Sequence, residues 1–154
     1  GAGTGRVRLD AGTLRFENDE AIDFKNDIDG VGTVAIAGSS GVRFKGDISK
    51  LDATLELASS VEFTSLPPFK TISNPTGRRV TLILAAGLGN VKWDARTLVD
   101  GSDRFKLLIG EGTTLDLGGA TLDVRTALKG SSARVVNGTL RESKPVRDLV
   151  LRLR

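Results

Sequence analysis

The stretch that decides the fold is residues 22–66, which read IDFKNDIDGVGTVAIAGSSGVRFKGDISKLDATLELASSVEFTSL. In this stretch a triplet of one apolar, one charged and one apolar residue returns at nearly constant spacing. The three copies, at successive offsets of 20 and 19, are Ile22-Asp23-Phe24, Val42-Arg43-Phe44 and Val61-Glu62-Phe63. A fixed period of about 20 residues is typical of proteins that stack structural repeats. The pattern therefore predicts a stack of short units.

A second triplet precedes the first in each unit and has the same alternation. Its copies, at successive offsets of 20 and 21, are Leu14-Arg15-Phe16, Val34-Ala35-Ile36 and Leu55-Glu56-Leu57. Alternation with period two predicts β-strands that turn their outer residues to one face. Glycines and serine pairs interrupt these strands at intervals too short for helices. Such short strands cannot bury an apolar face alone, so successive units are expected to stack in parallel around a shared core.

Parallel stacking predicts which side chains lie above one another, at the roughly 4.8 Å spacing of neighbouring strands. Three inward columns are expected, namely Phe24/Phe44/Phe63, Leu14/Val34/Leu55 and Phe16/Ile36/Leu57. The outward middle positions then form an acid–base–acid column of Asp23, Arg43 and Glu62. Opposite charges in register stabilise a sheet by about 0.2–1 kcal/mol per pair. An antiparallel meander would not bring these positions together.

The rhythm breaks at residues 67–79, where Pro67, Pro68 and Pro75 cannot donate ladder hydrogen bonds. We interpret this segment as an irregular insertion, or as a boundary between two halves of one stack. Strand patterns resume at 80–84 and continue to Leu140, and the spacing of Leu115 and Val135 repeats the period of the first half. Residues 149–154 are expected to form a final strand, or a strand that is interrupted where the sequence ends. The sequence thus predicts one all-β domain over residues 1–154.

Composition restricts the chemistry available to the chain. It has 154 residues with 19 Gly and no Cys, Met, His or Tyr, so disulfides and mechanisms that need His or a thiol are excluded. No metal site of Cys or His is possible, and we expect no cofactor. No apolar run is long enough to span a membrane, and no signal peptide opens the chain. Because the chain starts at Gly1, a processed product or an excised fragment is expected.

Charge is distributed unevenly along the chain. Residues 1–66 carry 7 basic and 11 acidic side chains, whereas residues 67–154 carry 15 and 8. A basic half favours acidic partners such as acidic glycans, lipopolysaccharide or nucleic acid, although scattered surface charge usually only solvates a face. No aromatic stacking set accompanies the charge, so no nucleic-acid partner is expected.

Few residue groups have a pattern that suggests chemistry. Two carboxylate pairs, Glu56 with Glu62 and Asp116 with Asp123, have the residue types used in glycoside hydrolysis. All four are expected at outward strand positions, where charge serves solubility, so we assign no catalytic residue. Residues 26–30 (NDIDG) lack the remaining Ca²⁺ ligands of an EF-hand and are interpreted as a turn.

Trp93 is the one indole of the chain, and it lies between Lys92 and, slightly further on, Arg96. A lone Trp in an alternating strand is more often part of the core than of a binding surface. An outward Trp93 beside Lys92 or Arg96 would favour sugar binding. These three residues are therefore the candidate ligand-binding site.

Two family resemblances follow from the repeats. Residues 27–34 (DIDGVGTV) and 41–48 (GVRFKGDI) resemble the repeats of bacterial autotransporter passenger domains, which are surface adhesins with a right-handed parallel β-helix. Residues 115–122 (LDLGGATL) and 136–140 (VNGTL) resemble the first coils of pectin-lyase-like β-helices, including phage tailspikes. Both resemblances imply a right-handed parallel β-helix, or β-solenoid, whose rungs here follow the repeat period of about 20 residues.

The first resemblance implies a non-enzymatic adhesin or surface scaffold, located outside the cell or on the bacterial surface, that binds a host-cell or glycan surface. The second implies a fragment of a tailspike that binds or cleaves bacterial polysaccharide, belongs to a virion tail and forms a homotrimer. The chain is too short for a complete glycan-cleaving helix, so it would be a piece of either protein.

Overall fold

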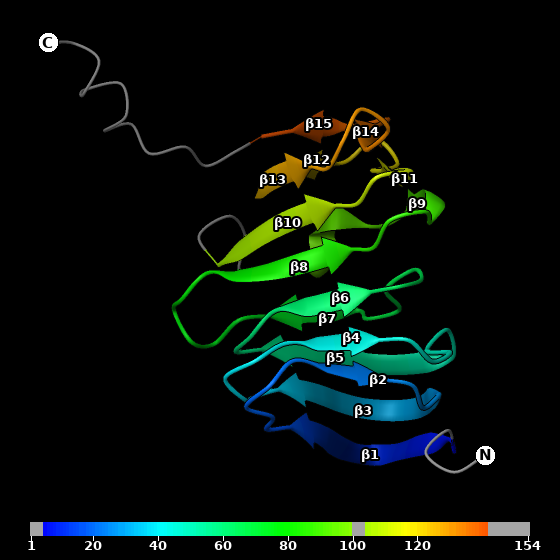
Figure 1. Cartoon of the computed structure of the whole chain (residues 1–154), viewed down its shortest axis with the longest axis vertical. Coiled ribbons are helices and arrows are strands. Elements are labelled where there is room, and N and C mark those ends of the chain that lie inside the picture. Colours follow the sequence, from blue (N-terminus) through cyan, green and yellow to red (C-terminus); the bar gives the residue numbers. More distant parts are fainter. Residues whose placement is uncertain (1–4, 100–103, 142–154) are drawn as a thin grey trace, which may run out of the picture.

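A computed structural model describes residues 5–99 and 104–141 of the chain. Within them the protein is an all-β parallel β-solenoid of about 6 turns, or rungs, with about 20 residues per turn and no α-helix. The strands lie one above another along the long axis, from β1 at one end to β15 at the other (Figure 1). The predicted all-β parallel β-solenoid with about 20 residues per turn is confirmed, and its right-handed coil stays a prediction.

Sheet A forms one side of the lower rungs. It consists of β1 (Val7–Phe16), β3 (Ile28–Ile36), β5 (Leu51–Leu57) and β7 (Thr71–Ser73), and all neighbouring strands are parallel. Its register places Leu14 beside Val34 and Val34 beside Leu55. Phe16, Ile36 and Leu57 are aligned in the same way. Both predicted columns of this sheet are confirmed.

Sheet B runs the length of the described stack. It consists of β2 (Ile22–Phe24), β4 (Val42–Phe44), β6 (Val61–Phe63), β8 (Val80–Leu84), β10 (Phe105–Ile109) and β13 (Arg125–Leu128), again all parallel. Phe24, Phe44 and Phe63 are aligned, which confirms the third column. The rings of Phe44 and Phe63 stack with centroids 6.0 Å apart. Phe24 is half-buried because it belongs to the terminal rung, and its ring contacts Phe16 edge-on.

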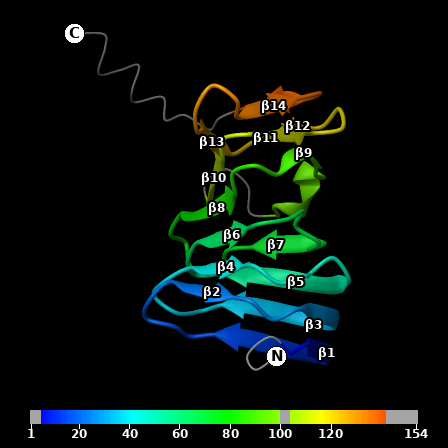
Figure 2. The same ribbon diagram turned by 45° about the vertical axis from the view of Figure 1, so that its right-hand side comes forward.

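The upper rungs contain two further sheets (Figure 2). Sheet C consists of β9 (Gly89–Lys92), β11 (Thr113–Asp116) and β14 (Arg134–Val136), and sheet D of β12 (Thr121–Leu122) and β15 (Thr139–Leu140). Leu115 pairs with Val135, as their spacing in the sequence predicts. A short 3₁₀ helix, η1 (Ala95–Thr97), follows β9, and Leu98 then forms a parallel bridge with Ile72 of β7.

The segment 67–79, interpreted from the sequence as an insertion, contributes to the stack. Its residues 71–73 form β7 and pair with β5, while Phe69 is buried in the core. Asn74 is fully buried, and its amide donates to the carbonyl oxygens of Arg78 and Arg104. Pro67 and Pro68 therefore lie in the connection before β7, and Pro75 lies in the turn after it, while the segment between them remains part of the stack.

Rungs approach one another most closely at certain glycines. A Cβ atom at Gly46 would overlap the carbonyl oxygen of Asn26 in the rung below, and one at Gly110 would lie 2.5 Å from the nitrogen of Ala86. At these positions only the hydrogen of glycine leaves room for the neighbouring backbone. The glycine content of the sequence is thus partly a requirement of stacking.

The final strand expected at residues 149–154 lies outside the described residues. Within the described residues, no helix is long and apolar enough to cross a membrane.

Candidate functional site

The three candidate ligand-binding residues border one open hollow, which we call the Trp93 hollow. It occupies about 740 Å³ at the end of β9, beside η1 and the turn between β11 and β12. Its lining consists of Lys92, Trp93, Asp94, Arg96, Leu117, Gly118, Gly119, Ala120 and Thr121. One side of the hollow is formed where the chain leaves β9 and enters η1. The other side is formed by the turn between β11 and β12 in the next rung.

Trp93 forms the inner wall of the hollow. Its side chain continues the inward alternation that begins at Val91, and only 4% of the residue is exposed. The outward ring that would favour sugar stacking is therefore not found. The indole N–H is buried and has no hydrogen-bond acceptor within the described part of the chain. Trp93 therefore acts mainly as part of the core.

Asp94 and Arg96 form a close ion pair at the rim of the hollow. The guanidinium Nε and Nη2 of Arg96 donate to the two carboxylate oxygens of Asp94 at 2.9 and 2.7 Å. The backbone N–H of Arg96 donates to the same carboxylate at 3.0 Å. These bonds, with the side-chain bond as the largest cause, lower the pKa of Asp94 to about 2. The rim thus presents a carboxylate and a guanidinium side by side at neutral pH.

A second pair of opposite charges lies on the outer face of sheet C. Lys92 is exposed and is the register partner of Asp116 in β11. The pKa of Asp116 is lowered, first by the backbone N–H of Gly118, then by the side-chain amide of Asn137, and also by the charge of Lys92. Each cation of the hollow therefore has an acid beside it, and the surface is polar without a strong net charge.

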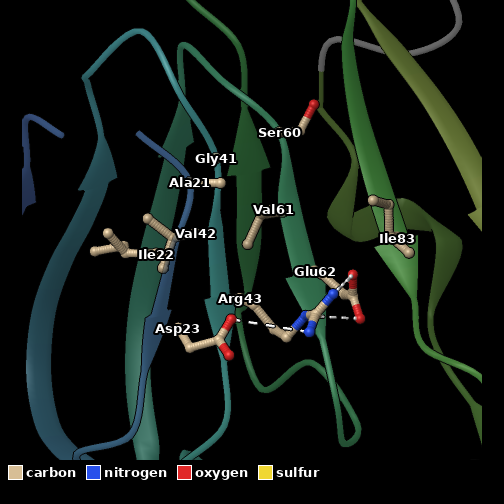
Figure 3. A pocket seen from close by; sticks show the side chains of 10 residues that line it. All are labelled: Ala21, Ile22, Asp23, Gly41, Val42, Arg43, Ser60, Val61, Glu62 and Ile83. Atoms are coloured by element: carbon tan, nitrogen blue, oxygen red, sulfur yellow. Dashed lines mark hydrogen bonds and ion pairs between the residues drawn. The ribbon is translucent and has the colours of Figure 1, made fainter. Parts of the chain in front are cut away.

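A smaller hollow lies on the outer face of sheet B and is shown in Figure 3. It occupies about 290 Å³, and the small residues Ala21, Gly41 and Ser60 leave room beside the predicted charge column. Arg43 lies between the two acids of that column, 3.8 Å from Asp23 and 3.1 Å from Glu62. The acid–base–acid column is confirmed. Arg43 is engaged on both sides, and Asp23 also lies 3.9 Å from Lys45, so the charged groups beside this hollow are paired with one another.

The two carboxylate pairs considered from the sequence are distributed over different sheets. Glu56 lies on β5 of sheet A, whereas Glu62 lies on β6 of sheet B. Asp116 ends β11 of sheet C, and Asp123 follows β12 of sheet D and forms an ion pair with Arg141 at 3.6 Å. Each acid other than Glu56 also has a neighbouring donor. The lowered pKa of Asp116 further disfavours a general acid, which needs a raised pKa.

The turn at residues 26–30 uses its polar side chains for structure. Asn26 donates to the carbonyl oxygen of Gly5, Asp27 accepts from the backbone N–H of Asp47, and Asp29 lies 3.3 Å from Arg6. Across residues 5–99 and 104–141, no three acidic side chains gather as a metal site would require. The contacts agree with a turn stabilised by side chains.

Sequence reasoning did not assign Asp94 or the Gly118–Gly119 turn to the site. The spacing of Asp94 and Arg96 is a recognisable signal, since an acid that precedes a short helical turn accepts the backbone N–H two positions on. The Gly-Gly turn carries no such signal, because only the fold of the next rung brings it to Trp93. No protein-family model, curated protein or solved structure matches the chain.

Proposed function

We propose that the protein is a non-enzymatic β-solenoid of the extracellular space or the bacterial surface, an adhesin or scaffold that binds glycan through the Trp93 hollow. The observation that carries the proposal is the Asp94–Arg96 pair on the rim of an open hollow. A carboxylate accepts hydrogen bonds from sugar hydroxyls, and a guanidinium donates to them. One rim therefore matches both hydrogen-bonding roles of a sugar diol.

The charge balance of the hollow favours a neutral glycan over a strongly acidic one. Lys92 and Arg96 each have an acid nearby, Asp116 and Asp94 respectively, so an anionic ligand gains little from long-range attraction. Thr121 adds an exposed hydroxyl. Gly118 and Gly119, which have no side chains, leave the hollow unobstructed where they line it. Host-cell or bacterial polysaccharide is the class of partner that this surface fits.

A scaffold role without catalysis is supported by the distribution of acids. The carboxylates that resemble hydrolytic pairs lie on separate sheets, and Glu62, Asp116 and Asp123 are engaged by neighbouring side chains. A glycosidase instead needs two carboxyl groups about 5–9.5 Å apart across the sugar. The resemblance to autotransporter repeats is consistent with this proposal, and its right-handed coil remains a prediction.

A glycan array tests the proposal. The wild-type chain is expected to retain a defined set of neutral glycans, and Arg96→Gln should reduce that signal at least tenfold because it removes the donor half of the rim. Arg15→Gln is the matched control, since Arg15 also pairs with a nearby acid, Glu17, at 2.6 Å, but lies on β1. Equal losses in both variants, or no binding by the wild type, would contradict a site at the hollow.

The same glycans should be recovered intact after incubation with the protein. Chromatography of the retained oligosaccharides checks this, and release of shorter products would favour the tailspike-type hypothesis over the scaffold.

A further inference from the structure

Within residues 5–99 and 104–141, the core of the solenoid is open at its C-terminal end, which is formed by β13, β14 and β15. Leu128 and Leu140 are 48% and 38% exposed, although they occupy inward columns. Their partners one rung below, Ile109 and Leu122, are 0% and 1% exposed. The difference arises because no described segment stacks on the last rung. This end therefore presents apolar side chains and unpaired strand edges together.

The N-terminal end, formed by β1 and β2, is open in a similar but milder way. Leu14 and Phe24 are half-buried, whereas Val34 and Phe44 directly above them are 0% and 1% exposed. The outer edge of β1 has no strand partner among the described residues along its whole length. Long free edges of this kind are templates for pairing with another strand.

The two ends are compatible in strand direction. Sheet B begins with β2 and ends with β13, and every strand between them is parallel. A copy shifted along the stack axis would therefore place its β2 against β13 in the orientation that the sheet already uses. A register shift between Asp10 and Gly12 divides β1 into two parts. With β2, the N-terminal end therefore has three short strand edges, and the C-terminal end has three short strands, β13, β14 and β15, to face them.

The ends also differ in charge. Residues 125–141 contain four basic side chains and no acidic one, namely Arg125, Lys129, Arg134 and Arg141. Residues 5–27 contain six acidic and four basic side chains, and Asp10, Glu17, Asp19 and Glu20 among the acids are exposed. Complementary charge speeds association and selects orientation. It favours contact between unlike ends and opposes contact between two C-terminal ends.

We propose that the C-terminal end of one copy docks onto the N-terminal end of a second copy, head to tail. Sheet B then continues from copy to copy, and Leu128 enters the column that contains Phe24 of the second copy. The contact is heterologous and translational, so it does not close on itself and adds copies in a row. The partner of this surface is thus another molecule of the same chain.

Sedimentation velocity of the full chain tests the proposal. The weight-average mass is expected to rise with concentration without stopping at a dimer, and to fall as salt is added. Leu128→Lys should abolish this growth because it puts a charge into the apolar contact. Leu66→Lys is the matched control, since Leu66 is 51% exposed between β6 and β7, in the middle of the stack, and should leave growth unchanged.

Mixing two blocked variants distinguishes the orientation. Asp10→Lys/Glu20→Lys reverses charge at the N-terminal end only, while Leu128→Lys blocks the C-terminal end only. Each is expected to remain monomeric alone, and an equimolar mixture should form a heterodimer and nothing larger. Thermal unfolding by circular dichroism checks that both variants fold.

Two outcomes would overturn the proposal. A wild-type chain that stays monomeric at every concentration means that the two ends do not bind each other. Association that survives Leu128→Lys, or a mixture that forms no heterodimer, would place the contact elsewhere.

Discussion

The first three rungs and the last three rungs differ in the length of their strands and in the residues of the outer column of sheet B. In the first three, sheet A is built from the long strands β1, β3 and β5, and the outer column of sheet B is charged through Asp23, Arg43 and Glu62. In the last three, shorter strands form sheets C and D, and the same outer column continues as Ile83, Leu108 and Ala127. The Trp93 hollow lies in this second half, at the end of β9, where the strands are shorter and their spacing is less regular.

The largest expected effect separates the interior of the stack from its end. Phe44→Ala should reduce the free energy of unfolding by about 3–5 kcal/mol, because Phe44 is buried between rungs and packs on Phe63. Phe24→Ala in the terminal rung should cost clearly less, since Phe24 is only half-buried. Chemical denaturation of both variants measures the difference. Equal costs would show that the first rung is covered as fully as the second.

The next effect concerns the close approach of rungs. Gly46→Ala should destabilise the protein by about 1–3 kcal/mol, because its Cβ would overlap the backbone of Asn26 and the rungs must move apart. Gly12→Ala is the control, since no atom lies within 4 Å of a Cβ built there. Thermal and urea unfolding compare the two. If both substitutions were neutral, the spacing between the first two rungs would be wider than described.

The regular half of the fold could be predicted because each of its units carries the same signal. Phe24, Phe44 and Phe63 recur with charged residues between apolar ones, so period and alternation together specify strands, register and the inward face. Leu115 and Val135 were predictable for the same reason.

The irregular half could not be predicted in full because its spacing varies. Leu55 pairs with Ile72, and their separation in the sequence is shorter than the period. Ile72 in turn bridges to Leu98, and that separation is longer than the period. The prolines at 67–75 also resemble a loop, although β7 lies within that region. The same limit applies to the site. Trp93, Lys92 and Arg96 were found from residue type, whereas Gly118 and Gly119 reach the hollow only through stacking of the next rung.

A smaller effect is expected in the charged column. Glu62→Lys places a like charge beside Arg43 and should cost about 0.2–1 kcal/mol relative to Glu62→Gln, which removes the charge alone. The difference between the two variants should shrink in about 1 M salt, where charges are screened within about 3 Å. Urea unfolding at low and high salt provides the comparison. A salt-independent difference would point to packing of the side chain as its cause.

The smallest effect is a titration in the irregular half. The pKa of Asp94 is lowered to about 2 from the ordinary 3.8, so its pair with Arg96 contributes fully above pH 3.8 and is lost as the pH falls through about 2. NMR titration of the Asp94 carboxyl carbon should give a midpoint near this lowered pKa. In Arg96→Gln the midpoint should rise toward the ordinary value, and an unchanged midpoint would mean that Arg96 does not hold the carboxylate.

The central claim is that positions one repeat period apart, about 20 residues, lie directly above one another in a parallel stack. With only six Phe in the chain, ring contacts can be assigned by NMR in a sample with labelled Phe. Nuclear Overhauser effects are expected between Phe44 and Phe63, with ring centroids 6.0 Å apart, and between Phe16 and Phe24, at 5.0 Å. Absence of contacts between Phe44 and Phe63 in the folded protein would contradict the stack.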